Sequence, residues 1–100
     1  MATVRAFLVQ ASTRPEDALP TYGDAAESYG GIPRAVGPIL NSIARDCTAA
    51  DEPDLTALVV DRTSRRPRSF EGHPVEPGST AEGRWRQELE RIRSHRWQDA

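Results

Sequence analysis

The sequence has no lysine, only one cysteine and no long apolar run. The single cysteine, Cys47, excludes an internal disulfide. Without a long apolar segment, the residues predict neither a signal peptide nor a membrane span, and the expected location is the cytoplasm. Because all 13 basic residues are arginines, a pattern typical of GC-rich codon usage, the arginine content alone does not indicate nucleic-acid binding.

The chain has 100 residues, of which 37% are hydrophobic and 28% are charged. This composition predicts a single small domain over residues 1–100 with a modest core and long loops. The net charge of −2 conceals an asymmetry: residues 1–61 hold four arginines and nine acids, whereas residues 62–100 hold nine arginines and six acids. The second part of the chain is therefore the basic one.

Two amphipathic helices are predicted near the ends of the chain. Behind Thr3 as an N-cap, apolar residues recur at helical spacing over residues 4–11 (Val4, Phe7, Leu8 and Ala11). Near the other end, Ser79 and Glu82 form a capping box, and apolar residues follow at spacings of four and three (Trp85, Leu89 and Ile92). We expect this C-terminal helix to cover residues 79–97.

A helix-turn-helix is predicted over residues 21–48. Thr21 and Asp24 form a capping pair for a first helix, which should end at Gly30-Gly31. Pro33 suits the first turn of a second helix, whose apolar face is formed by Val36, Leu40, Ile43 and Cys47. Pro38 leaves open a kink in this helix or a start nearer Gly37.

A strand and a wing are predicted over residues 55–75. The run LTALVV at 55–60 is rich in β-branched residues and is bounded by Pro53 and a polar loop, so it predicts a strand. Residues Ser69 to Val75 predict a weak second strand of a hairpin. The expected fold is mainly α with a small β-hairpin: a winged helix-turn-helix plus N- and C-terminal helices.

The stretch TYGDAAESYGGIPRAVGPIL resembles the start of the DNA-binding domain of the O6-alkylguanine-DNA alkyltransferases and alkyltransferase-like proteins. The resemblance covers roughly residues 20–68 and is carried by Thr21-Tyr22, by two small helix residues and by Arg34-Ala35-Val36-Gly37. It implies that Tyr22 lies at a DNA phosphate and that Arg34 fills the space of an extruded nucleotide. It also implies that the small Ala35 and Gly37 let the second helix approach DNA closely.

The same comparison predicts that the chain is not an enzyme. Where the family has its Pro-Cys-His-Arg segment, Thr56 and Ala57 occupy the acceptor cysteine and histidine positions. Cys47 lies on the apolar face of a predicted helix, which indicates an inert core thiol. His73 and His95 lack metal-ligand spacing, so we expect no metal and no cofactor. A small enzyme is kept as a third hypothesis only because distant residues can assemble a site.

Two functions follow as hypotheses. The first is non-catalytic, regulatory or damage-sensing binding of double-stranded DNA, with phosphate contacts from a basic loop formed by Arg62, Arg65, Arg66 and Arg68. The alternative for this loop is a solvated segment that pairs with the acidic part of the chain.

The second function is a protein-interaction module that uses the same fold or the C-terminal helix with Trp85 and Trp97, although packing is the simpler role for both tryptophans. One surface distinguishes the two hypotheses. Arg34 and the arginines at 62–68 on one face, with Asp24 and Glu27 off it, favour DNA. Arginines that point to opposite sides or pair with acids favour a protein partner.

Overall fold

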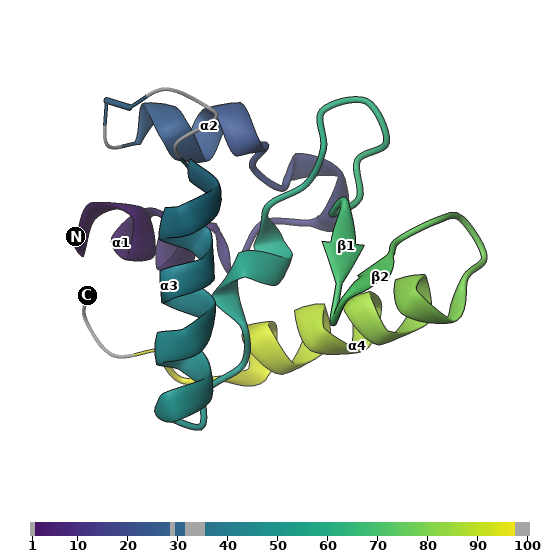
Figure 1. Cartoon of the computed structure of the whole chain (residues 1–100). Coiled ribbons are helices and arrows are strands. Elements are labelled where there is room, and N and C mark those ends of the chain that lie inside the picture. Colours follow the sequence, from purple (N-terminus) through teal and green to yellow (C-terminus); the bar gives the residue numbers. More distant parts are fainter. Residues whose placement is uncertain (1, 29, 32–35, 98–100) are drawn as a thin grey trace.

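The computed structural model describes residues 2–28, 30–31 and 36–97, which form a mainly helical fold with one small antiparallel hairpin (Figure 1). This confirms the predicted fold class. In chain order the elements are α1 (Ala2–Ala11), the short 3-10 turn η1 (Glu16–Ala18), α2 (Tyr22–Glu27), α3 (Val36–Ala49), the 3-10 turn η3 (Leu55–Leu58), β1 (Ser69–Phe70), β2 (His73–Pro74) and α4 (Thr80–Ser94).

The centre of the fold is η3, which packs against α1, α3 and α4 (Figure 1). The strand predicted over residues 55–60 is therefore wrong. Asp54 caps η3, because its carboxylate accepts hydrogen bonds from the backbone N–H and the hydroxyl of Thr56. Apolar side chains on both sides of this segment are buried, which removes the in-out alternation of a half-buried strand. Only Val60 has strand-like pairing, in a parallel bridge with Thr21.

The first predicted helix of the helix-turn-helix is present as α2. The Thr21 hydroxyl accepts from the Asp24 N–H at 3.1 Å, and the Asp24 carboxylate accepts from the Thr21 N–H at 3.0 Å, so the capping pair is confirmed. After α2 ends, Gly30 takes a φ of +75°, a conformation that glycine adopts without steric strain. The predicted glycine stop is thus correct, with the regular helix ending slightly earlier at Glu27.

The apolar face predicted for α3 is also confirmed, since Val36, Leu40, Ile43 and Cys47 are all buried. As described, α3 begins at Val36, so Pro38 lies in its first turn. The backbone N–H groups of a first turn have no partner inside the helix, and the N–H that proline lacks is therefore not missed there. Pro33 lies outside the described residues.

The terminal helices bury their predicted apolar faces, with Phe7 only partly buried, but their ends differ from the predictions. α1 already begins at Ala2, so Thr3 lies within it and is not its N-cap. α4 ends at Ser94, short of the predicted residue 97. At its start Ser79 accepts from the Glu82 N–H, but the Glu82 carboxylate accepts from Gly78 and not from Ser79. Only half of the predicted capping box is therefore formed.

The hairpin lies entirely within the segment that was predicted to be one strand. Phe70 pairs with His73, and the turn between them has positive φ at Glu71 and Gly72. β1 packs against α4 (Figure 1). Whether α2, α3 and this hairpin act as a winged helix-turn-helix remains a prediction. Among the described helices, none combines the length and apolar character needed to cross a membrane.

Candidate functional site

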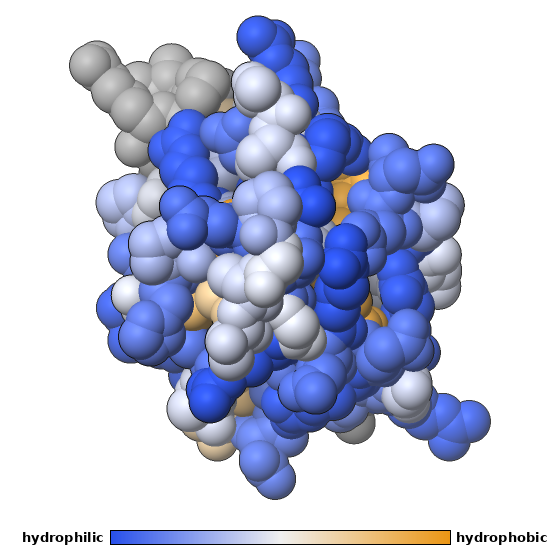
Figure 2. All heavy atoms as spheres, turned by 90° about the vertical axis from the view of Figure 1, so that its right-hand side faces the viewer, coloured by the Kyte–Doolittle hydropathy of each residue, from blue (hydrophilic) through white to orange (hydrophobic). Residues whose placement is uncertain are grey.

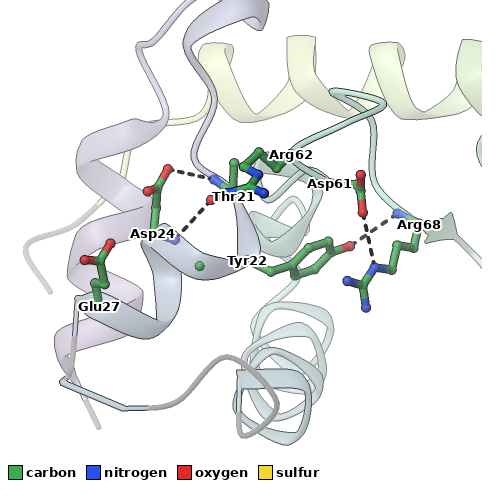
Figure 3. Close-up of a pocket in the computed structure, with 8 residues that line it drawn as sticks. Thr21, Tyr22, Asp24, Glu27, Asp61, Arg62 and Arg68 are labelled. Atoms are coloured by element: carbon green, nitrogen blue, oxygen red, sulfur yellow. Dashed lines mark hydrogen bonds and ion pairs between the residues drawn. The ribbon is translucent and has the colours of Figure 1, made fainter.

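Residues of two distant segments line a surface pocket of about 360 Å³ (Figure 3). One segment is α2 with its N-cap, and the other is the 61–68 loop, which follows the buried Val60. Backbone contacts hold them together: the Val60 N–H donates to the Pro20 carbonyl at 2.9 Å. The lining residues are Thr21, Tyr22, Gly23, Asp24, Glu27, Asp61, Arg62 and Arg68. Four predicted site residues, Thr21, Tyr22, Arg62 and Arg68, are thus brought together.

Tyr22 and Arg68 make two contacts across this pocket. The Arg68 backbone N–H donates to the Tyr22 hydroxyl at 3.2 Å, and the Arg68 guanidinium carbon lies 4.8 Å from the centre of the Tyr22 ring. A guanidinium over an aromatic face is attracted by the ring quadrupole. Tyr22 therefore fixes both the backbone and the side chain of Arg68.

Asp61 holds the other side of Arg68. Its Oδ1 accepts from the Thr63 and Ser64 N–H groups at 2.8 and 3.2 Å, and its Oδ2 lies 3.6 Å from Arg68 Nε. The two N–H groups, followed by the arginine, lower the pKa of the Asp61 carboxyl. Asp61 is a site residue that the sequence reasoning missed. Its signal was an Asp two and three residues before Thr63 and Ser64, a pattern typical of a side-chain-closed turn.

Carboxylates also occupy the opposite end of the pocket. Figure 3 shows Asp24 and Glu27 on the far side of Tyr22 from Asp61 and Arg68. Asp24 is engaged in the α2 cap, whereas Glu27 is exposed. With Arg62 and Arg68 against Asp24, Glu27 and Asp61, the pocket carries charges of both signs.

The other two arginines of the predicted basic loop serve the fold. Arg65 donates through Nη2 to the carbonyls of Asp17 and Leu19 at 3.1 and 2.9 Å. Arg66 pairs with the buried Glu82. These contacts occupy Nη2 of Arg65 and Nε and Nη1 of Arg66, so phosphate contacts from the two residues stay a prediction.

No described residue of α3 lines the pocket. Gly37 is exposed on α3, and a Cβ built there meets no atom within 4 Å, so this glycine is not required by packing in the free protein. The predicted site residues Arg34 and Ala35 lie outside the described residues.

The tryptophans do not form the partner surface that the C-terminal helix was expected to present. Trp85 is fully buried, and its indole N–H donates to the Ala57 carbonyl at 2.8 Å. Trp97 lies beyond the end of α4 and folds back, with its indole N–H donating to the Ile92 carbonyl at 3.0 Å. Packing, the simpler role given to both tryptophans, is thus confirmed for the buried Trp85, and the half-buried Trp97 also packs against the core.

The basic character of residues 62–100 is largely balanced within the molecule. Along α4, arginines pair with carboxylates (Arg84 with Glu71, Arg86 with Glu16 and Glu82, Arg91 with Glu88, and Arg93 with Glu90). Figure 2 shows a face of mostly hydrophilic residues with only small, separate apolar spots. A partner on that face would therefore meet a mixed polar surface.

Two features bear on catalysis: the Cys47 thiol and the grouping of side chains that could hold a metal ion. Cys47 is buried, and this burial raises the pKa of its thiol, although the Leu55 N–H and Arg5 act in the opposite direction. Within the described ranges, no three His, Cys, Asp or Glu side chains are grouped so that they could hold a metal ion. The pocket between α2 and the 61–68 loop is the candidate site with the most predicted residues.

Comparisons with known proteins add no family to this description: no family model, no curated protein and no solved structure matches the chain.

Proposed function

We propose that this chain is a non-catalytic protein-binding module and that the pocket between α2 and the 61–68 loop is its binding site. The observation that carries the proposal is that Arg62 and Arg68 share one pocket with Asp24, Glu27 and Asp61. A protein segment can offer both charges to such a pocket, with its acidic group near the arginines and its basic group near Asp24 and Glu27.

DNA is the poorer match for the same pocket. A duplex presents phosphates, and Asp24 and Glu27 would face this negative charge beside the two arginines. Arg65 and Arg66, which the sequence offered as further phosphate contacts, are engaged with the carbonyls of Asp17 and Leu19 and with Glu82. The criterion set out from the sequence asks for arginines on a face without these acids; Arg62 and Arg68 share their pocket with Asp24 and Glu27, and Arg34 lies outside the described residues.

A peptide selection tests the proposal. A displayed library of random peptides is selected on the wild-type chain, and the recovered peptides are measured by fluorescence anisotropy. We expect binding to fall by about tenfold or more in an Arg62→Ala and Glu27→Ala double variant, as for loss of central interface contacts. Arg45→Ala is the matched control, because Arg45 is exposed on α3 and does not line the pocket.

A labelled DNA duplex is titrated in parallel over a salt series. We expect no binding that depends on the pocket arginines. Duplex binding that weakens with salt and falls further in Arg62→Ala would overturn the proposal in favour of DNA. Peptides that bind the double variant and the wild type equally would also overturn it.

A further inference from the structure

Arg68 is the most exposed of the ion-paired arginines, yet it is also held in one orientation. Its side chain is 74% exposed. Two contacts nevertheless restrain it, its guanidinium over the Tyr22 ring and its Nε beside Asp61, and the backbone N–H of Arg68 donates to the Tyr22 hydroxyl. These contacts use one face and one edge of the guanidinium.

The terminal nitrogens are the part of the Arg68 guanidinium that the described contacts leave unused. Among the described residues, no hydrogen bond uses Nη1 or Nη2 of Arg68, and its contact with Asp61 is through Nε. Arg65 and Arg66 differ from Arg68 in this respect. Nη2 of Arg65 donates to the carbonyls of Asp17 and Leu19, and Nε of Arg66 pairs with Glu82. Arg68 thus lines the pocket and carries a planar pair of donors, with its guanidinium restrained by Tyr22 and Asp61.

We infer that Arg68 is the anchor of the pocket and binds a carboxylate side chain, Asp or Glu, of a protein partner; this rests on the proposed function. A guanidinium matches a carboxylate through two parallel hydrogen bonds, a geometry that an ammonium group cannot reproduce. Because Tyr22 and Asp61 restrict the rotamers of Arg68, less conformational entropy is lost when the ligand binds.

Asp61 orients Arg68 through Nε but does not take up the other donors of the guanidinium. The separation of 3.6 Å and the exposure of Arg68 make this a loose surface pair, and Asp61 is itself held by the Thr63 and Ser64 N–H groups. An incoming carboxylate can therefore bind the free edge while Asp61 stays in place. Arg62 lines the same pocket and adds a second positive charge that offsets Asp61.

Asp24 and Glu27, at the other end of the pocket, favour a protein ligand over a phosphate ligand. Asp24 and Glu27 favour a partner in which the carboxylate is accompanied by a cationic group, which a protein segment provides and a run of phosphates does not. The geometry therefore points to a carboxylate on a protein rather than to a phosphate.

The test observes Arg68 directly, without any partner. The Nε–Hε signals of ¹⁵N-labelled protein are followed by NMR, and the Arg68 signal is assigned from its loss in Arg68→Lys. The probe is N-acetylglutamate methylamide, its control is N-acetylglutamine methylamide, and the second arm uses inorganic phosphate. We expect a saturable shift of the Arg68 signal with the glutamate probe and none with the glutamine probe.

Two variants separate orientation from charge. Tyr22→Leu removes the ring but keeps the arginine, and we expect it to weaken binding of the glutamate probe about threefold or more. Arg45→Lys, away from the pocket, should leave the titration unchanged. No shift of the Arg68 signal with the glutamate probe would overturn the inference, as would phosphate binding at least about tenfold tighter than the glutamate probe.

The selected peptides distinguish this inference from the proposed function. A double-mutant cycle combines Arg68→Gln with Glu→Gln or Asp→Asn changes in a peptide, and a coupling of about fivefold or more supports the anchor. Peptides that depend on the pocket but show no such coupling would overturn the anchor and leave the proposed function standing. A probe shift at Arg68 without any pocket-dependent peptide would overturn the proposed function and support the carboxylate preference of Arg68.

Discussion

The indole N–H of Trp85 donates to the carbonyl oxygen of Ala57 at 2.8 Å in the fully buried contact between α4 and η3. Trp85→Phe keeps an aromatic ring but leaves this buried carbonyl without its donor. We expect the free energy of unfolding to fall by about 1–3 kcal/mol, the cost of an unsatisfied buried polar group, with some further loss from the smaller ring. Chemical denaturation followed by circular dichroism measures this change.

Trp97→Phe is the control for that measurement. Trp97 also donates to a carbonyl, that of Ile92, but it is only half-buried, so water can replace the lost donor. The loss of stability should be clearly smaller than for Trp85→Phe. Equal effects of the two substitutions would contradict the assignment of η3 and Trp85 as the centre of the core.

The helices were predictable because their signals are local. Thr21 with Asp24, and the spacing of Val36, Leu40 and Ile43, act within one or two turns of the chain. The structure of segment 55–60 was not predictable in this way, because its β-branched residues fit a strand as well as they fit a 3-10 turn. Burial on every side, together with the cap at Asp54, decides for a 3-10 turn, and that burial depends on α1, α3 and α4, two of which, α1 and α4, lie far away in sequence.

The candidate site was predictable only in part. Tyr22, Arg62 and Arg68 were proposed as site residues, and the structure brings them into one pocket. The run of arginines does not reveal which of them line the pocket and which bind the rest of the fold. That division arises because Arg66 reaches Glu82 and Arg65 reaches the Leu19 carbonyl. The role of Asp61 depends on Arg68 and Tyr22 folding onto it, a relationship across distant residues.

Glu82 should make stability depend on acid pH. The hydrogen bond from Arg66 is the largest cause of its lowered pKa, followed by the Gly78 N–H and the charge of Arg86. A carboxyl whose pKa is lower in the folded state stabilises the fold above its ordinary pKa, and this contribution is lost as pH falls through the folded value. Thermal midpoints measured from neutral to acid pH should therefore fall more steeply in wild type than in Glu82→Gln.

Glu90→Gln serves as the comparison for Glu82→Gln. Glu90 lies on the same helix and pairs with Arg93, but its side chain is 72% exposed. We expect its pH profile to follow that of wild type. If the thermal midpoints of Glu82→Gln and wild type fall in parallel as the pH is lowered, protonation of Glu82 is not the cause of the loss of stability in acid.

Cys47 should be unreactive in the folded protein. It is buried, and burial raises the pKa of its thiol, so neither access nor the thiolate form is available to an alkylating reagent. Modification by iodoacetamide must then wait for opening of the fold, and we expect it to be about 10³-fold or more slower than in concentrated guanidinium. Mass spectrometry over time gives the rate.

A cysteine placed on the surface tests the same reagent under native conditions. Ser42 is exposed on α3, so Ser42→Cys in a Cys47→Ala background should react at nearly the rate of the unfolded chain. Rapid native alkylation of Cys47 itself would show a reactive thiol and reopen the hypothesis of a catalytic role.

Gly72 and Gly37 should respond in opposite directions to the same substitution. Gly72 has a φ of +81° in the hairpin turn, and a Cβ there meets no atom within 4 Å, so Gly72→Ala should destabilise by about 1–2 kcal/mol through backbone strain alone.

Gly37 is helical and equally free of contacts, so Gly37→Ala should stabilise by up to about 1 kcal/mol through helix propensity. Unfolding midpoints in urea measure both changes. Gly37→Ala also bears on function, because the alkyltransferase resemblance gives this glycine a role only when DNA lies against α3. A more stable Gly37→Ala protein that has lost binding to a duplex would favour DNA, because the lost contact would then be with DNA and not within the fold. If no duplex binding is found in wild type or variant, the only expected consequence of the added methyl group is the gain in helix stability.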